Sequence, residues 1–400
     1  MLRSLFSGIS GMRAHQTMLD VTGNNIANVN TTGFKSSQVI FQDALSQQLT
    51  SASAPQDSVG GSNPAQVGLG VRVAGVTTNF AQGSSQATGR AQDMMINGDG
   101  FFVVRQGTQT YYTRSGAFDF DSTGQMVLPG EGAIVQGWPA VDGVVDTTGA
   151  LGDLSIPVGT VMPAKATTTA DVTGNLPADA AVGTTRERTI TAYASDGTER
   201  TLALTFTRTA AGWDLAASDG TASLTTPLGV AFTADGKLDL ASSDLGTTGS
   251  FALGGVTVDL STITGYTGVD SVKIDHQDGS AAGELQSFSL GSDGTITGSF
   301  SNGLDQVLGR IALSSFANPG GLEKAGGSLY TATANSGTAQ VGTSGSGGRG
   351  SLSGGYLEMS NVDLSSEFTN LIVAQRGFQA NARVITTSDD VLQELVNLKR

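Results

Sequence analysis

The last part of the chain, residues 364–400, reads LSSEFTNLIVAQRGFQANARVITTSDDVLQELVNLKR. Large apolar residues recur in it every seven positions, which is the spacing of a stripe along one face of a coiled-coil helix. This C-terminal stripe consists of Leu364, Leu371, Phe378, Ile385 and Leu392, with Phe368 and Ile372 beside it. Asp363 stands at the N-cap position and Glu367 in the first turn, where the helix dipole favours negative charge. The sequence therefore predicts one continuous helix from Leu364 to Arg400.

The N-terminus carries a similar but shorter pattern. Its N-terminal stripe consists of Leu5, Met12, Leu19 and Ile26, with Ile9 on a flanking row. Residues 1–30 contain only Arg3, Arg13 and Asp20 as charged residues, so the polar face of this helix is mostly neutral. Neutral faces suit helices that meet other protein on several sides. We expect the two terminal helices to pair as a coiled-coil-like inner domain; a hairpin within one chain, packed on its body, is the alternative that the residues leave open.

The segments between the two helices read as short strands separated by turns. The turn residues 97–100 precede the apolar run 101–104, and Ser-Asp-Gly triplets recur at 195–197, 218–220 and 292–294. We therefore predict mainly β outer domains, built as antiparallel sandwiches or barrel-like sheets, with helices only at the two ends.

One glycine-rich segment near the C-terminal helix stands apart from these strands. Residues 342–355 include the run Gly-Ser-Gly-Gly-Arg-Gly, and such a composition is typical of a linker. The segment is predicted to be a flexible or extended connector.

Composition restricts the possible partners. The chain of 400 residues has 21 Lys and Arg against 35 Asp and Glu, a formal charge of -14 that repels phosphate backbones and anionic lipid alike. We therefore expect no nucleic-acid partner. It has no cysteine, which excludes disulfides and thiolate metal sites. No apolar stretch is long enough to span a bilayer, and the first residues lack the continuous apolar core of a secretory signal.

Signs of enzymatic chemistry are weak. The glycines of 345–350 have the spacing of a dinucleotide-binding loop, but no strand-turn-helix pattern surrounds them. The only histidines are His15, expected on a helix surface or interface, and His276, expected in a solvated loop, so no histidine pair can bind a metal ion. Residues 119–124 are better explained by a hairpin turn than by a calcium loop. We predict no catalytic residue, no cofactor and no metal site.

Two motifs, one from each end of the chain, give the strongest sign of identity. Residues 21–35 read VTGNNIANVNTTGFK, residues 360–364 read SNVDL, and residues 371–382 read LIVAQRGFQANA. These motifs resemble those of the bacterial flagellar rod and hook proteins. The motif residues singled out are Asn24, Asn25, Ile26, Ala27, Asn28, Thr32, Gly33, Phe34, Asn361, Val362, Asp363 and Leu364. The resemblance covers nearly the whole chain and is weakest between about residues 182 and 280.

The resemblance implies a nested architecture of discontinuous domains. The expected parts are a helical inner core domain of residues 1–30 and 360–400, a connecting region of 31–71 and 326–359, a first β-domain of 72–145 and 281–325, and an inserted outer β-domain of 146–280. A distal rod subunit shares both termini but lacks such an inserted domain. Length therefore favours a hook subunit, with a distal rod subunit and a secreted β-rich adhesin as the alternatives.

The resemblance also implies a function without enzymatic activity. Hook subunits are expected to polymerise through residues of the two apolar stripes into a flexible, curved tube, a universal joint that couples rotation of the motor and rod to the filament. The partners then implied are further copies of the chain, the hook cap protein, the distal rod protein, the hook-filament junction protein and the flagellar type III export apparatus. The implied location is the extracellular part of the bacterial flagellum, reached without a cleaved secretory signal.

Overall fold

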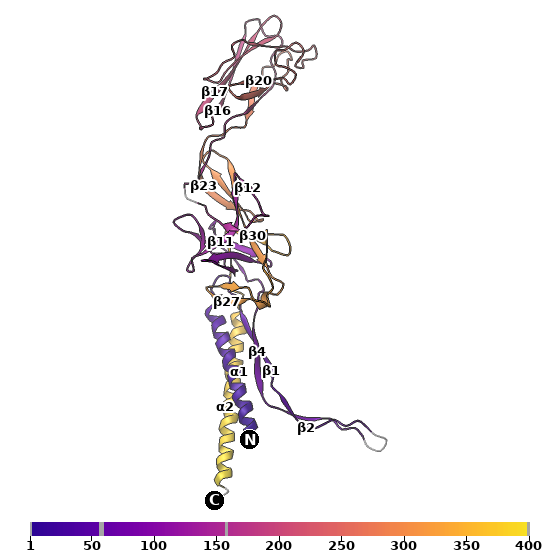
Figure 1. The fold of residues 1–400 in the computed structure, drawn as a ribbon, viewed down its shortest axis with the longest axis vertical. Coiled ribbons are helices and arrows are strands. Elements are labelled where there is room, and N and C mark those ends of the chain that lie inside the picture. Colours follow the sequence, from indigo (N-terminus) through magenta and orange to yellow (C-terminus); the bar gives the residue numbers. More distant parts are fainter. Residues whose placement is uncertain (1, 56–59, 157–158, 398–400) are drawn as a thin grey trace. The chain divides into compact units, whose positions relative to one another are not determined.

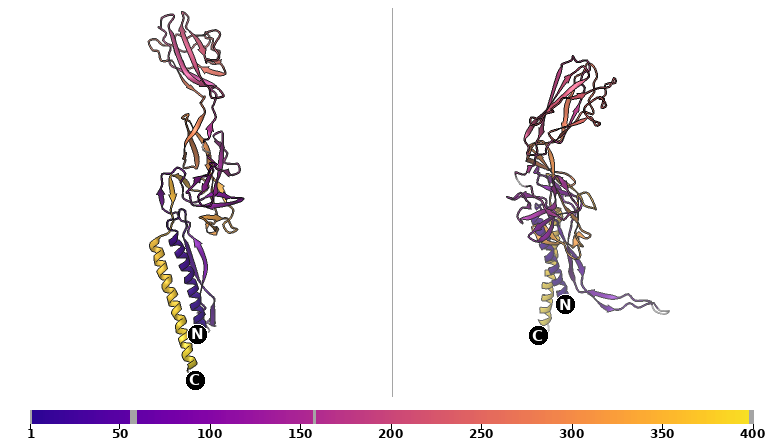
Figure 2. Two further views of the ribbon diagram at one scale, coloured as in Figure 1. Left: turned by 90° about the vertical axis from the view of Figure 1, so that its left-hand side faces the viewer. Right: turned by 45° about the horizontal axis from the view of Figure 1, so that its top comes forward.

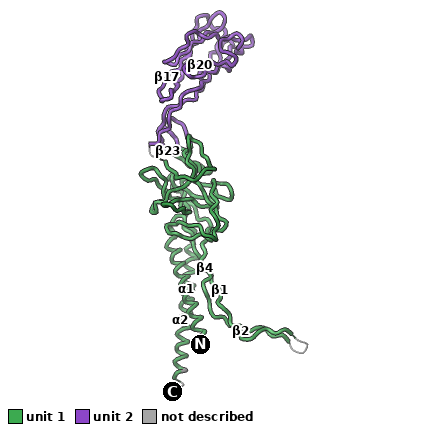
Figure 3. The backbone as a smooth tube through the Cα atoms, viewed as in Figure 1, with its two compact units in different colours: residues 1–157, 288–297, 307–400 green, residues 158–287, 298–306 purple. Residues whose placement is uncertain are grey.

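The computed structural model describes residues 2–55, 60–156 and 159–397. The chain forms two compact units, shown in green and purple in Figure 3. Unit 1 comprises residues 1–157, 288–297 and 307–400, and unit 2 comprises residues 158–287 and 298–306. The finer division into four nested parts stays a prediction.

Unit 1 contains both long helices. Helix α1 spans Leu2–Ala27 and helix α2 spans Leu364–Asn397. The two lie side by side in Figures 1 and 2 and run antiparallel, because Gly8 meets Ile385 near one end while Asn25 meets Glu367 near the other. The predicted pairing of the terminal helices is confirmed, and it occurs within one chain. Residues 398–400, the end of the predicted helix, lie outside the described residues.

The start of α2 follows the expected capping chemistry. Asp363 Oδ1 accepts hydrogen bonds from the backbone N–H groups of Ser365 (2.9 Å) and Ser366 (3.4 Å). These N–H groups have no partner inside the helix, so the carboxylate satisfies them and its charge complements the helix dipole. The N-cap prediction for Asp363 is confirmed.

The rest of unit 1 is built from strands. They are β1 (Ser37–Asp43), β2 (Ser46–Thr50), β3 (Ala65–Gly68), β4 (Val71–Thr78), β5 (Ser85–Ala87), β6 (Met94–Asn97), β7 (Phe101–Gln106), β8 (Gln109–Thr113), β9 (Asp119–Phe120), β10 (Met126–Leu128), β11 (Ala133–Val141), β12 (Val144–Val145), β13 (Gly152–Asp153), β26 (Leu313–Ser315), β27 (Glu323–Gly326), β28 (Leu329–Thr331), β29 (Gln340–Gly342), β30 (Ser351–Gly354) and β31 (Tyr356–Glu358), with a short 3-10 helix at Pro319–Gly321. Strands β23 (Gly283–Leu290), β24 (Thr295–Phe300) and β25 (Asp305–Ile311) have residues in both units.

The main sheet of unit 1 has an aromatic core. Within it the strands follow the order β25-β11-β7-β8-β28-β27, all paired antiparallel. Phe101 of β7 is 2% exposed and its ring meets those of Phe80, Phe316 and Tyr330 at centroid distances of 5.4, 5.7 and 5.9 Å. Tilted and edge-on aromatic contacts of this kind add to the free energy gained by burying the rings.

Strands β1 and β4 lie beside α1, and the chain between them forms the β2-β3 hairpin (Figure 1). Every residue of β2 and β3 is exposed, whereas α1 covers part of β1 and β4. The ring of His15 on α1 packs edge-on against Phe41 of β1 with 5.6 Å between centroids. His15 is half-buried, so it lies at a contact between elements.

Unit 2 is a two-sheet β-sandwich. Its strands are β14 (Val161–Met162), β15 (Thr169–Thr173), β16 (Thr185–Tyr193), β17 (Glu199–Arg208), β18 (Trp213–Ser218), β19 (Leu228–Val230), β20 (Ser250–Leu253), β21 (Val256–Asp259) and β22 (Lys273–Gln277). The sheets have the orders β16-β17-β18-β19 and β20-β21-β15-β22. Along β17, Leu202, Leu204 and Phe206 are fully buried and alternate with less buried residues, as expected for a strand with one face on a core.

Two details of unit 2 differ from the sequence predictions. His276 was expected in a loop but lies on strand β22, opposite Asp171 of β15, with its side chain exposed. The sheet β20-β21-β15-β22 also contains a parallel pair, β15 with β21, whereas its other two strand pairs are antiparallel. The prediction of mainly β outer domains with helices at the chain ends is confirmed.

The predicted connector at residues 342–355 is a fixed part of unit 1. Strand β30 pairs with β6. Before it, Arg349 Nε donates to the carbonyl oxygen of Thr343 (3.1 Å) and closes the turn of residues 343–349. The glycines serve tight turns, since Gly345, Gly347 and Gly348 all have positive φ. Of the prediction of a flexible or extended connector, the flexible alternative is wrong, because a linker and a series of tight turns share the same composition, whereas β29 and β30 at the two ends of the segment are extended.

Candidate assembly surface and the polar junction beside it

The N-terminal and C-terminal motifs meet in space at a polar junction where the helix pair joins the β-region. Asn25 is 1% exposed, and its amide Nδ2 donates to the carbonyl oxygen of Ser37 (2.8 Å) and to Glu367 Oε1 (2.9 Å). Its Oδ1 accepts a hydrogen bond from the backbone N–H of Ser37 (3.0 Å). One side chain thus ties α1 to β1 and to the first turn of α2.

Asn361 does the same from the other end of the chain. Its Oδ1 accepts a hydrogen bond from the N–H of Ser36 (2.8 Å), and its Nδ2 donates to the carbonyl oxygens of Asn79 (2.8 Å) and Ala81 (3.0 Å). An asparagine offers both donors and an acceptor, so it can tie the start of α2 to two backbone segments that are themselves joined by the hydrogen bond from the N–H of Asn79 to the carbonyl oxygen of Ser36 (2.8 Å). This explains why the motif carries an amide here.

A buried charge cluster lies beneath the junction. Lys35, Arg114 and Glu358 are 0, 2 and 1% exposed. Lys35 Nζ donates to Glu358 Oε1 (2.6 Å) and to the carbonyl oxygen of Ala81 (2.8 Å), while Arg114 NH1 lies 3.5 Å from Glu358 Oε2. Glu358 Oε1 also accepts a hydrogen bond from the N–H of Gly83 (2.9 Å). One carboxylate therefore neutralises part of the charge of two buried cations.

Burial dominates the electrostatics of this cluster. It lowers the pKa values of Lys35 and Arg114, because desolvation disfavours their charged forms, and the charge of Glu358 partly offsets this effect. Such a cluster is costly unless all three groups are present. It therefore locks the N-terminal motif to the strand that precedes the C-terminal motif.

Gly33 allows the N-terminal motif to turn into this junction. Its φ is +68°, and a Cβ at this position would clash with the backbone of Arg114 and Ser115. Its N–H donates to the carbonyl oxygen of Glu358 (2.7 Å). Both the left-handed backbone and the close approach require glycine.

The remaining residues of the N-terminal motif shape the end of α1. Asn28 Nδ2 donates to the carbonyl oxygen (2.9 Å) and to Oδ1 (3.0 Å) of Asn24, and Thr32 Oγ1 lies 3.3 Å from Ser115 Oγ. The ring of Phe34 is half-buried below Lys324 Nζ, which lies 5.1 Å from its centroid. The other motif residues, Ile26, Ala27, Val362 and Leu364, make none of these polar contacts.

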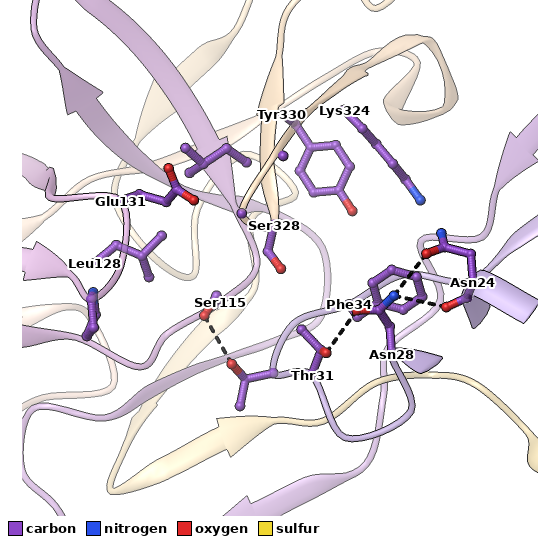
Figure 4. A pocket seen from close by; sticks show the side chains of 15 residues that line it. Asn24, Asn28, Thr31, Phe34, Ser115, Leu128, Glu131, Lys324, Ser328 and Tyr330 are labelled. Atoms are coloured by element: carbon purple, nitrogen blue, oxygen red, sulfur yellow. Dashed lines mark hydrogen bonds between the residues drawn. The ribbon is translucent and has the colours of Figure 1, made fainter. Parts of the chain in front are cut away.

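A pocket of about 480 Å³ opens between this motif and the turn that joins β27 to β28 (Figure 4). Asn24, Phe34, Glu131, Lys324 and Tyr330 are among the residues that line it. Burial raises the pKa of the Tyr330 hydroxyl to about 12. The residues that line it include no histidine and one carboxylate, that of Glu131.

The two helices contact each other through small residues. Ala14 and Ala374 are 3 and 0% exposed, and a Cβ on Gly11 would lie 2.6 Å from Asn381 Oδ1. Gly377 lies directly under the ring of His15. Close approach of the backbones therefore uses positions that have no bulky side chain.

The apolar stripes predicted from the sequence are only partly buried in the single chain. Eight of the residues of the two stripes are half-buried: Leu5, Ile9, Met12, Leu19, Ile26, Leu371, Ile385 and Leu392. On the outer surface of α2, Leu364, Phe368, Ile372 and Phe378 are 40, 52, 57 and 37% exposed. The structure thus leaves an apolar surface on α2 that its own α1 does not cover.

The small-residue contact predicts opposite effects of the same substitution at two helical glycines. Gly377→Leu is expected to loosen the helix pair, because the new side chain would meet His15. Gly23 is at an open position, because a Cβ added there would have no neighbouring side chain within 4 Å. Gly23→Leu should therefore stabilise α1 by about 0.5 to 1 kcal/mol, since leucine is a better helix former than glycine. Hydrogen exchange of amides in both helices measures the effect: protection should fall in the first variant and rise in the second. Equal changes in both variants would contradict a contact at Gly377.

Sequence reasoning missed several residues of the junction. Arg114, Lys324 and Glu358 were not singled out, and Lys35 was only quoted as the last residue of the motif. A charged side chain is ordinarily exposed, so nothing local marks these as buried. Their position next to the motifs was the only available signal.

The described ranges contain neither a metal-ligand cluster nor a membrane-spanning helix. No group of three or more histidine, cysteine, aspartate or glutamate residues there could hold a metal ion. None of the helices in the described part of the chain is both long and apolar enough to cross a membrane.

Three family models match successive parts of the chain. The model described as "Flagella basal body rod protein" matches residues 5–35, "Flagellar hook protein FlgE/F/G D1 domain" matches 95–174, and "Flagellar basal body rod FlgEFG protein C-terminal" matches 353–398. The first and third cover the two motifs that meet at the polar junction.

A solved hook protein structure shares the fold. A crystal structure of Helicobacter pylori flagellar hook protein FlgE2 superposes with a TM-score of 0.52 at 15% identity, covering 68% of this chain and 100% of that one. At that identity the likeness concerns the fold alone.

Full-length relatives carry the assignment. The flagellar hook proteins FlgE of Treponema pallidum and Borreliella burgdorferi are 41 and 40% identical to this chain, each over 100% of both sequences. The flagellar basal-body rod protein FlgG of Bacillus subtilis is 35% identical, also over 100% of both. This rod protein is therefore related to the chain but less similar to it than the two hook proteins are. The chain belongs to the flagellar hook protein FlgE family, and it is accordingly a structural subunit of the bacterial flagellar hook and no enzyme.

Proposed function

We propose that this chain polymerises into the hook tube through the surface of α2 that α1 leaves uncovered. The observation that carries the proposal is the exposure of Phe368, Ile372, Val373 and Phe378, which are 52, 57, 53 and 37% exposed along three turns of one helix. Removing apolar area from water contributes about 25 cal/mol per Å². Neighbouring copies in a helical array can supply the missing cover.

The residues proposed for assembly are those of both apolar stripes. Full burial of a large apolar side chain contributes about 1.5 to 3 kcal/mol. Several such side chains per subunit can exceed the free energy lost when two chains associate. The few charges on these helices support this proposal, because a buried contact tolerates neutral polar groups better than unpaired charges.

The outer β-domains are proposed to let the tube bend. Residues 146–280 are rich in Gly, Thr and Ala, so few strong ion pairs can fix one register between neighbouring copies. Contacts of this kind can slide while the helical inner domain, proposed as residues 1–30 with 360–400, holds the tube together. The connecting region and the first β-domain, with the limits given above, are proposed to lie between these two parts.

The further partners are proposed from the family. They are the distal rod protein below the hook, the junction protein and cap at its far end, and the export apparatus through which the chain passes without a cleaved secretory signal. The finished location is proposed to be outside the cell.

Immunogold electron microscopy of isolated flagella, with antibody raised against residues 146–280, tests the location. Label should be confined to the short curved segment between the basal body and the filament. Label on the straight rod would favour a distal rod subunit, and label scattered over the cell surface would contradict a flagellar role.

A further inference from the structure

A second surface on unit 1 carries apolar and positively charged side chains together. A groove of about 390 Å³ lies between α1 and β4, lined among others by Phe6, Ile9, Arg13, Val71 and Arg72. Phe6 is 67% exposed, so its ring gains little cover from the chain itself. The groove can therefore accept another apolar surface.

The two arginines of this groove are free to meet a negative charge. Arg72 NH2 donates only to the amide oxygen of Gln42 (3.1 Å), and in the part of the chain that the structure describes neither Arg13 nor Arg72 forms an ion pair. Asp43 lies opposite Val71 on the neighbouring strand, but it too is without an ion pair there. The groove is thus positively charged and partly apolar, and it suits an acidic, partly apolar partner.

The end of α2 has the complementary character. Asp389, Asp390 and Glu394 are exposed, and Val391 and Val396 are 44 and 70% exposed. Asp390 and Glu394 are four residues apart and so share one face of the helix. No ion pair involves these three carboxylates among the described residues.

This end of α2 runs past its partner helix. Gly8 meets Ile385, so in antiparallel helices Leu2 lies near residue 391, and the residues after it extend beyond α1. Figures 1 and 2 show the yellow C-terminal end of α2 continuing beyond the N-terminal end of α1. Within the described residues, α1 does not cover the part of α2 beyond residue 391.

The end of α2 cannot reach the groove of its own chain. Gly11 meets Asn381 and His15 meets Gly377, so Arg13 lies beside the middle of α2. Residue 390 is farther along by roughly 16 Å, at 1.5 Å per residue. A continuous helix does not fold back over such a distance. If the end of α2 binds in the groove, it must therefore come from a second copy of the chain.

We propose that the groove of Phe6, Arg13 and Arg72 receives the acidic end of α2 from a second copy of the chain. This rests on the proposed polymerisation and names one of its contacts. The two surfaces are different parts of the same chain, so each subunit offers one of each. A head-to-tail contact of this kind leaves one unused surface at each end of a dimer, so further copies can add, and it gives an open helical array where the rotation between copies does not close a ring.

Charge reversal with rescue tests this contact in the full-length chain. Arg13→Glu with Arg72→Glu, and separately Asp390→Lys with Glu394→Lys, should each raise the critical concentration for polymerisation at least about tenfold, because like charges then face each other. The variant with all four changes should return to within about threefold of the original chain. Lys237→Glu with Lys273→Glu in unit 2 is the control, since it changes the net charge as much as the arginine pair does. Sedimentation at several protein concentrations gives the critical concentration.

The outcomes separate this contact from the proposed function. If the original chain forms no polymer, both proposals fail. If it polymerises and neither double variant differs from it, the groove contact is wrong while polymerisation stands. If both double variants are impaired and the fourfold variant is not rescued, each surface meets something other than its counterpart, and the proposed pairing is overturned.

Discussion

Polymerisation is expected to be lost when Ile372 and Phe378 are both replaced by aspartate. Both side chains lie on the uncovered surface of α2, 57 and 37% exposed, so the monomer tolerates the change. In a polymer two carboxylates would replace two buried apolar groups, at a cost of more than about 3 kcal/mol per subunit. Each 1.4 kcal/mol is a factor of ten, so the critical concentration should rise more than about 100-fold. Sedimentation and negative-stain electron microscopy measure the loss.

The matched control places the same substitutions on unit 2. Val182 and Val269 are 71 and 53% exposed, and replacing both by aspartate adds the same charge to unit 2. This control should polymerise normally. The fluorescence of Trp213, which is buried in unit 2, should be unchanged in the helix variant and so show that the β-sandwich still folds. Normal tubes formed by the Ile372→Asp and Phe378→Asp variant would contradict the proposed surface.

Glu358→Ala is expected to destabilise unit 1 by about 3 to 5 kcal/mol. The substitution leaves Lys35 and Arg114 buried without their common carboxylate, and it removes the acceptor for the N–H of Gly83. Urea unfolding followed by Trp138 fluorescence measures the effect in a Trp213→Phe background, where the remaining tryptophan reports on unit 1. The unfolding midpoint should fall clearly.

Two variants show whether charge is the cause. Glu131→Ala removes an exposed carboxylate and should leave the midpoint nearly unchanged. Glu358→Gln keeps an acceptor for Lys35 and Gly83 but removes the charge, so it should fall between the original chain and Glu358→Ala. An unchanged midpoint in Glu358→Ala would show that the cluster does not join the two motifs energetically.

The helices and the general β-character were predictable because their signals are local. A seven-residue apolar repeat marks a helix wherever it lies, and Asp363 marks the start of α2 by chemistry that involves only the next three residues. Turn residues between short apolar runs likewise predict strands without knowledge of their partners.

The contact between the helices was not predictable in the same way. The apolar repeat drew attention to Leu371 and Phe378, whereas the closest approach uses Gly11 and Gly377, which have no side chain to create a pattern. Small residues are informative only when the facing helix is known. The repeat instead marks residues that remain partly exposed in the single chain, which is why they are proposed for assembly.

The polar junction depends on residues far apart in the sequence. Lys35 and Glu358 are separated by most of the chain, and each alone looks like an ordinary charged surface residue. Likewise, the segment before α2 has the composition of a linker, but strand β6 gives β30 a partner that only the fold reveals. The motifs could be recognised, but their physical role required the structure.

The most direct test of assembly through α2 uses a single cysteine in a chain that otherwise has none. Cysteine at position 372 is labelled with a maleimide in the monomer and in the polymer, and cysteine at position 182 on unit 2 serves as the control. The proposed assembly predicts rapid labelling of position 372 in the monomer and strong protection in the polymer, with position 182 protected less. Equal labelling of position 372 in both states would show that this surface stays open to water, and it would contradict assembly through α2.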